Sequence, residues 1–140
     1  MKGPLQYLLD TNVVSETRKK HADPRVLAFL SSVDPSALFI SVLTLGELRK
    51  ALAQKQRTDP QTASWIEPWV SGLELSFADR LLGIDSATTK LWGEWSSERP
   101  RPVIDTLLAA LAKTHELILV TRNTSDLQGL PIEILNPWLT

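Results

Sequence analysis

The chain has 140 residues, of which 43% are hydrophobic and 22% are charged, which is typical of a globular protein rather than a disordered one. It contains no cysteine, so disulfides, thiolate metal sites and a cysteine nucleophile are excluded. The formal net charge is −1 and gives no support for nucleic-acid binding. Because no segment is typical of a signal peptide or a membrane span, we expect one cytoplasmic domain over residues 1–140, without contact to membranes.

The first part of the chain predicts one buried strand followed by two helices. Residues 5–9 form a short apolar run that favours a strand, and residues 10–12 are all good helix-capping types. Residues 13–20 then predict a helix with a basic end. Asp23, followed by a proline, predicts the N-cap of a second helix over about 24–33, because proline suits the first helical position.

The middle of the chain continues the alternation of strands and helices. Residues 38–41 predict a second strand, and residues 44–56 predict a helix with leucines along one stripe. Asp59 and Pro60 predict the start of another helix, which we expect to end near Gly72.

The last part of the chain predicts two helices and three strands. In chain order these are a strand at 80–84, a helix from 85 or 86 that includes Trp92 and Trp95, a loop at 97–102, a helix at 103–115, and strands at 117–121 and 132–135. Almost wholly apolar strands that alternate with helices are typical of a parallel sheet covered by helices on both faces. The fold class is therefore predicted to be α/β, with ligands bound at the carboxyl ends of the strands.

Four acidic residues are candidates for a site at that edge of the sheet. Asp10 directly follows the first strand, and Asp126 closely follows a later one. Glu47 and Asp105 lie near the starts of helices. Each has an ordinary explanation when taken alone: a helix cap, a turn residue, a surface glutamate, or an acid in the first helical turn. Their joint placement favours a cluster instead.

A cluster of carboxylates needs a cation to hold it together. Two carboxylates about 4 Å apart repel each other by about 4 kcal/mol at an effective dielectric of about 20. Three or four would therefore take up protons or move apart unless a cation bound them. Oxygen ligands without cysteine or convergent histidine favour Mg²⁺ or Mn²⁺ over zinc. Such a site suits hydrolysis of a phosphodiester, because the metal activates water and neutralises charge on the phosphoryl oxygens.

Five segments resemble, in their order along the chain, the motifs of PIN-domain proteins, and most closely those of the VapC and FitB toxins of prokaryotic toxin–antitoxin pairs. They are LLDTNVVSE (8–16), ISVLTLGEL (40–48), PVIDTLLAA (102–110), LVTRNTSDL (119–127) and ILNPW (134–138). The resemblance implies a three-layer α/β/α sandwich with a central, mainly parallel sheet. It also implies Mg²⁺- or Mn²⁺-dependent cleavage of RNA, a homodimer, and inhibition by a small antitoxin. The resemblance implies that the protein would contact DNA only indirectly, through this antitoxin.

The resemblance also assigns roles to individual positions. The acids that match the family's metal-binding and catalytic positions are Asp10, Glu47, Asp105 and Asp126. Thr121 and Asn123 match its polar positions beside the last acid, and Arg122 lies between them as a supporting polar residue. Leu127 departs from the pattern, since relatives often have phenylalanine there, and we expect only a change in packing.

Two other functions remain open. The chain could be a PIN module that binds RNA or an antitoxin without cutting, although its complete set of acids argues against this. It could also be a nuclease that acts on single-stranded DNA. Apart from Arg122, the basic residues that could line an RNA path are equally well explained as solvated surface: Arg18, Lys19, Lys20, Arg49, Lys50, Arg99 and Arg101. The helical spacing of four tryptophans favours core or dimer packing over base stacking.

Overall fold

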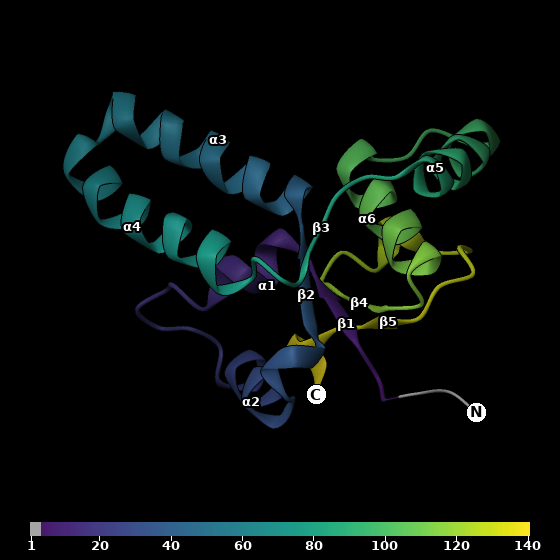
Figure 1. The fold of residues 1–140 in the computed structure, drawn as a ribbon, viewed down its shortest axis with the longest axis horizontal. Helices are drawn as coiled ribbons and strands as arrows, with labels where there is room; N and C mark the ends of the chain where they lie inside the picture. Colours follow the sequence, from purple (N-terminus) through teal and green to yellow (C-terminus); the bar gives the residue numbers. More distant parts are fainter. Residues whose placement is uncertain (1–3) are drawn as a thin grey trace.

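The chain folds around a parallel sheet whose strands follow the order β3-β2-β1-β4-β5 (Figure 1). The computed structural model describes residues 4–140, and all five strands of the sheet lie within them. The strands are β1 (Tyr7–Leu9), β2 (Leu38–Ser41), β3 (Leu81–Leu82), β4 (Ile118–Val120) and β5 (Ile134–Leu135). The predicted mainly parallel sheet is confirmed, and each strand is shorter than or equal to its predicted range.

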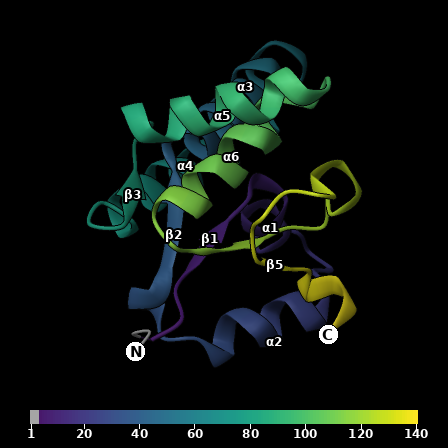
Figure 2. The same ribbon diagram turned by 90° about the vertical axis from the view of Figure 1, so that its right-hand side faces the viewer.

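Helices cover both faces of this sheet, which confirms the three-layer α/β/α architecture (Figure 2). The helices are α1 (Thr11–Glu16), α2 (Pro24–Ser32), α3 (Val42–Thr58), α4 (Pro60–Ser76), α5 (Ser86–Glu98) and α6 (Val103–Thr114). Short 3-10 turns add η1 (Pro35–Ala37), η2 (Ser125–Leu127) and η3 (Pro137–Leu139). Among residues 4–140, no helix is both long and apolar enough to cross a bilayer.

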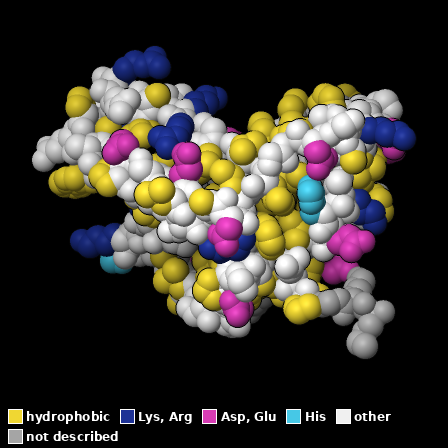
Figure 3. Space-filling view, in the orientation of Figure 1, with side chains coloured by type: hydrophobic (Ala, Val, Ile, Leu, Met, Phe, Trp, Pro, Cys, Tyr) yellow, Lys and Arg dark blue, Asp and Glu magenta, His cyan; other side chains and the backbone are white. Residues whose placement is uncertain are grey.

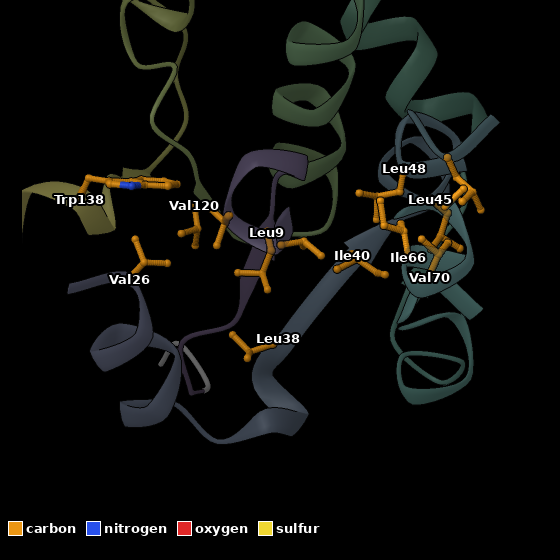
Figure 4. Packing of buried hydrophobic residues seen from close by; sticks show 14 residues of the cluster. Leu9, Val26, Leu38, Ile40, Leu45, Leu48, Ile66, Val70, Val120 and Trp138 are labelled. Atoms are coloured by element: carbon orange, nitrogen blue, oxygen red, sulfur yellow. The ribbon is translucent and has the colours of Figure 1, made fainter. Parts of the chain in front are cut away.

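Two buried clusters, one on each face of the sheet, hold the layers together. Leu8 belongs to the cluster formed with α5 and α6, whereas Leu9 belongs to the cluster formed with α1 to α4. The same alternation separates Leu119 from Val120 on β4, because successive side chains of a strand point to opposite faces. Figure 4 shows the second of these clusters, with Trp138 of η3 beside Val120 and α2.

Several helix boundaries differ from the predicted ones because local capping and packing decide them. α1 begins at Thr11 instead of residue 13, since Asp10 itself caps the helix. α3 begins at Val42, because the hydroxyl of Ser41 accepts a hydrogen bond from the amide of Leu43 at 2.9 Å. α4 does not end near Gly72 but continues to Ser76, since its last turns stay packed against the core through Leu73.

Candidate active site

Asp10 lies where β1 ends and α1 begins, and its carboxylate serves both elements. One oxygen accepts the N-cap hydrogen bond from the amide of Val13 at 2.9 Å. The other accepts a hydrogen bond from the hydroxyl of Thr121, which follows β4. The residue is only 3% exposed. Burial raises the pKa of the Asp10 carboxyl, the two hydrogen bonds oppose that rise, and the charge of Asp105 adds to it.

Glu47 reaches the same region from α3. Its carboxylate accepts a hydrogen bond from the hydroxyl of Thr11, the first residue of α1, and that hydroxyl also lies 3.4 Å from the hydroxyl of the buried Thr44. Within residues 4–140, Glu47 forms no ion pair with Lys50, the partner that an ordinary surface position would favour. Glu47 is therefore tied to the helix that Asp10 caps.

Asp105 lies in the first turn of α6 and connects the four acids electrostatically. Burial raises the pKa of its carboxyl most, and the charges of Asp126 and then Glu47 raise it further. The charge of Asp105 in turn raises the pKa of Asp10. Asp126 lies in η2 and is exposed. Asp10, Glu47 and Asp126 therefore each lie close enough to Asp105 for the charges to interact.

The segment after β4 carries polar side chains that alternate in direction. The Thr121 hydroxyl donates to Asp10 and accepts from the amide of Asn123 at 3.0 Å. The side chain of Asn123 lies beside Asp105 and lowers the pKa of its carboxyl. Arg122, between them, instead lies over the ring of Trp138, with 4.0 Å from its guanidinium carbon to the ring centroid. Thr121 and Asn123 thus contact the acids, while Arg122 lies against the C-terminal turn.

The fold and this arrangement can be compared with known proteins. A family model of the PIN domain matches residues 7–128, which is most of the chain. The chain belongs to the PIN-domain family. It is 30% identical to toxin FitB of Neisseria gonorrhoeae over 136 residues, covering 94% of the chain and 97% of FitB. It is 31% identical to VapC ribonuclease Y4jK of Sinorhizobium fredii over 145 residues, covering 94% of the chain and 96% of that relative.

The structure of this PIN domain is also similar to a solved one. The crystal structure of FitAcB from Neisseria gonorrhoeae superposes with a TM-score of 0.87 at 26% identity. The match covers 96% of the chain and 100% of the matched chain. The predicted family and fold are therefore confirmed over nearly the whole length.

The acids of this PIN domain fit a hard divalent cation in their chemistry. Carboxylates whose pKa is raised by burial and by neighbouring carboxylates gain stability when a positive ion joins them. Oxygen donors of this kind suit Mg²⁺ or Mn²⁺. In the described part of the chain, no three His, Cys, Asp or Glu side chains already lie close enough together to hold a metal ion. Side chains of these acids would therefore have to move closer together to bind an ion jointly.

Two residues with specific hydrogen-bond partners, Thr11 and Glu16, are not singled out by the sequence pattern. Thr11 orients Glu47, whereas the sequence pattern marks it only as one of three good helix-capping types. Glu16, at the end of α1, is buried and accepts a hydrogen bond from the amide of Asp23 at 2.9 Å. An acid at a helix C-terminus opposes the helix dipole, and this was the available signal that Glu16 has a specific partner.

The remaining basic and aromatic candidates are spread over the surface and core. Figure 3 shows acidic and basic side chains dispersed over one face of the molecule. Arg49 pairs with Glu74 at 2.9 Å, and Arg18 lies over Trp69. Trp95 is buried, which confirms core packing for that ring, whereas Trp65 is 71% exposed. 

Proposed function

We propose that this protein is a metal-dependent endoribonuclease and the toxin of a toxin–antitoxin pair, which hydrolyses RNA with a carboxylate-bound Mg²⁺ or Mn²⁺ ion. The observation that carries the proposal is the electrostatic coupling of four acids around Asp105 at the carboxyl ends of parallel strands. The names of two relatives, a toxin and a ribonuclease, support the activity and the biological role.

The polar side chains of the site would have distinct roles in binding and orienting the ion. Asp10, Glu47, Asp105 and Asp126 would hold the ion. When bound, the ion would lower the pKa of a water molecule and neutralise charge on the scissile phosphate. Thr121 and Thr11 would fix the orientations of Asp10 and Glu47 through their hydroxyl groups, so less rotamer freedom is lost when the ion binds. Asn123 would keep Asp105 in its ionised, ligating form.

A toxin must be restrained in the cell that makes it, so we propose a small cognate antitoxin as the protein partner. Any contact with DNA would be made through that antitoxin, since a formal net charge of −1 gives the chain no general attraction to phosphates. We also propose that the active form is a homodimer. 

Cleavage of matched substrates by the purified protein tests this function. We expect cleavage of single-stranded RNA in Mg²⁺ or Mn²⁺, with 5′-phosphate and 3′-hydroxyl ends and no cleavage in EDTA. No histidine or lysine among the described residues contacts the acids, which leaves a metal-activated water as the nucleophile that the site favours. Asp10→Asn and Asp105→Asn should each reduce the rate by at least about a hundredfold, because each removes a negative ligand while keeping its shape.

The control is Asp79→Asn, the same change at a carboxylate that is 82% exposed and pairs only with the neighbouring Arg80. It should cleave at the wild-type rate. Activity that survives EDTA, or 2′,3′-cyclic phosphate ends, would refute the metal-water mechanism. Binding of RNA without cleavage would identify a binding module. Cleavage of single-stranded DNA of the same sequence, with the RNA left intact, would identify a deoxyribonuclease.

A further inference from the structure

The segment that follows β4 has few backbone contacts of its own. The amide of Thr121 makes the last bond to the sheet, to the carbonyl of Leu135 at 3.0 Å. Beyond it, the amide of Thr124 bonds to the carbonyl of Arg122 at 2.9 Å, which only closes a local turn. Asn123 is therefore held by its bond to the Thr121 hydroxyl and by whatever restrains Arg122.

Arg122 is restrained by a group that lies far from it in sequence. Its guanidinium lies 4.0 Å from the centroid of Trp138, a ring that is 5% exposed and belongs to the buried cluster beneath α2. Two acids of the neighbouring segment have other cationic partners, since Glu16 pairs with Lys19 at 2.9 Å and Asp23 pairs with Arg25 at 2.9 Å. The stack on Trp138 is therefore the contact that restrains the Arg122 side chain.

Trp138, on which Arg122 stacks, is itself held in place by its surroundings. Trp138 lies in η3, whose first amide is capped by the side chain of Asn136 at 3.0 Å, and η3 packs against α2. Figure 4 shows Trp138 and Val26 of α2 pointing toward one another. Within residues 4–140 the indole N–H of Trp138 has no hydrogen-bond partner, so the ring holds its place through packing and the arginine alone.

We propose that Arg122 is a positioning residue, clamped on Trp138 so that its two neighbours, Thr121 and Asn123, hold Asp10 and Asp105 in place. The importance of this clamp for catalysis rests on the function proposed above. The clamp explains why a conspicuous arginine inside the acidic motif does not contact the acids. It also gives the C-terminal turn a role in the site, because Trp138 contacts Arg122, which lies between Thr121 and Asn123.

Amide hydrogen exchange of the metal-free protein tests the clamp without any assumption about catalysis. The exchange rate of the Asn123 amide is measured relative to that of Ile40, whose amide lies in the sheet and reports global opening. Arg122→Met and Trp138→Leu should each raise this ratio about fivefold, the equivalent of a cation–π contact of about 1 kcal/mol. Trp138→Phe keeps an aromatic face and removes no hydrogen bond, so it should stay near the wild type.

Two comparisons separate the clamp from general loss of packing. Val70→Ala leaves a cavity in the same buried cluster, on α4 and away from the Arg122 stack (Figure 4), and it should leave the ratio unchanged. Combining Arg122→Met with Trp138→Leu should add little to either change alone, because both break one contact. An unchanged ratio in Arg122→Met would overturn the proposal. An increase in Val70→Ala equal to that in Trp138→Leu would also overturn it.

Titration with Mn²⁺, followed by the electron paramagnetic resonance of the free ion, links the clamp to the acids. We expect Arg122→Met and Trp138→Leu to weaken Mn²⁺ binding severalfold, and Val70→Ala and Arg18→Met to leave it unchanged. If the wild type binds no Mn²⁺, the proposed metal site is wrong, while the exchange ratio still decides the clamp. If Arg122→Met weakens only RNA binding, with exchange and Mn²⁺ affinity unchanged, Arg122 is a substrate contact and the clamp is refuted.

Discussion

Asp105 is the residue at which burial and neighbouring charge act in the same direction. Its carboxyl is partly buried, and the charges of Asp126 and Glu47 oppose its ionisation. Only the side chain of Asn123 favours the ionised form. In the metal-free protein, ionisation of Asp105 therefore reduces the stability of the fold, because the unfolded chain carries the same charge in water.

This gives a prediction for the pH dependence of stability in EDTA. The folded state raises the pKa of Asp105 above its ordinary value of 3.8, so between these two values the folded protein binds more protons than the unfolded chain. The contribution of Asp105 is fully present below pH 3.8 and is lost as pH rises through the raised pKa. Asp105→Asn should be more stable than the wild type at pH 7, and the difference should shrink toward zero in acid.

Urea unfolding of both proteins at several pH values measures this difference. Carboxyl groups with a lowered pKa, such as Asp23 and Asp85, change the free energy of unfolding with pH in the opposite direction. Both proteins contain these groups, so their contributions cancel in the comparison. A wild type that is the more stable of the two at pH 7, with metal absent, would mean that Asp105 has a favourable partner in the folded state.

At the scale of elements, the cap of α3 decides where Glu47 is presented. Ser41 ends β2 and caps α3, and its side chain is fully buried. Because the helix begins immediately after the strand, Glu47 comes in the second turn, beside Thr11. A change in this cap would alter both the start of α3 and the link between α3 and α1.

Replacement of Ser41 by alanine should lower the free energy of unfolding by about 1 kcal/mol, since the amide of Leu43 loses its acceptor. Chemical denaturation at pH 7 measures this, with an unchanged dependence on denaturant. The matched control is Ser36→Ala, which removes an exposed hydroxyl bonded to Asp34 at 2.9 Å and should change stability by less than about 0.5 kcal/mol. Equal effects of the two changes would argue that the α3 cap contributes nothing beyond a surface hydroxyl.

The elements that the sequence predicted well are those fixed by local pattern. Apolar runs located every strand, and Asp23 and Asp59 marked the starts of α2 and α4 through their capping side chains. The predicted end of α4 was wrong. Gly72 is a local signal for the end of a helix, whereas the packing of Leu73 against the core cannot be read from the sequence.

The same distinction applies to the candidate site. Positions after strands pointed to Asp10 and Asp126, although their catalytic roles remain predictions. The direction of Arg122 was not predictable, because it depends on Trp138, which the fold brings from the C-terminal turn. The partnership of Thr11 with Glu47 likewise appears only when α1 and α3 lie side by side.

At the scale of the whole molecule, the exposed apolar residues of α4 bear on the proposed homodimer. Trp65 is 71% exposed and Leu75 is 80% exposed in the isolated chain. Large apolar side chains of this kind are stabilised when a second subunit removes them from water. Light scattering at micromolar concentration should therefore give the mass of two chains.

Trp65→Ser should shift this equilibrium toward the monomer without loss of helical circular dichroism. Leu139→Ser, at an equally exposed apolar residue in the C-terminal turn, should leave the dimer intact. A wild type that scatters as one chain at micromolar concentration in the absence of antitoxin would refute the dimer.

The sheet separates two buried clusters, and the acids come from both sides of that division. Asp10 caps α1 and Glu47 lies in α3, both in the α1–α4 layer, whereas Asp105 and Asp126 belong to α6 and η2 of the other layer. An ion shared by these carboxylates would link the two layers of the fold to each other. At a hundred times its Kd it would add about 2.7 kcal/mol to the stability of both layers at once. The protein would then resist proteases best with the ion bound, which is also its active form. The cellular concentration of Mg²⁺ would therefore control both its lifetime and its activity.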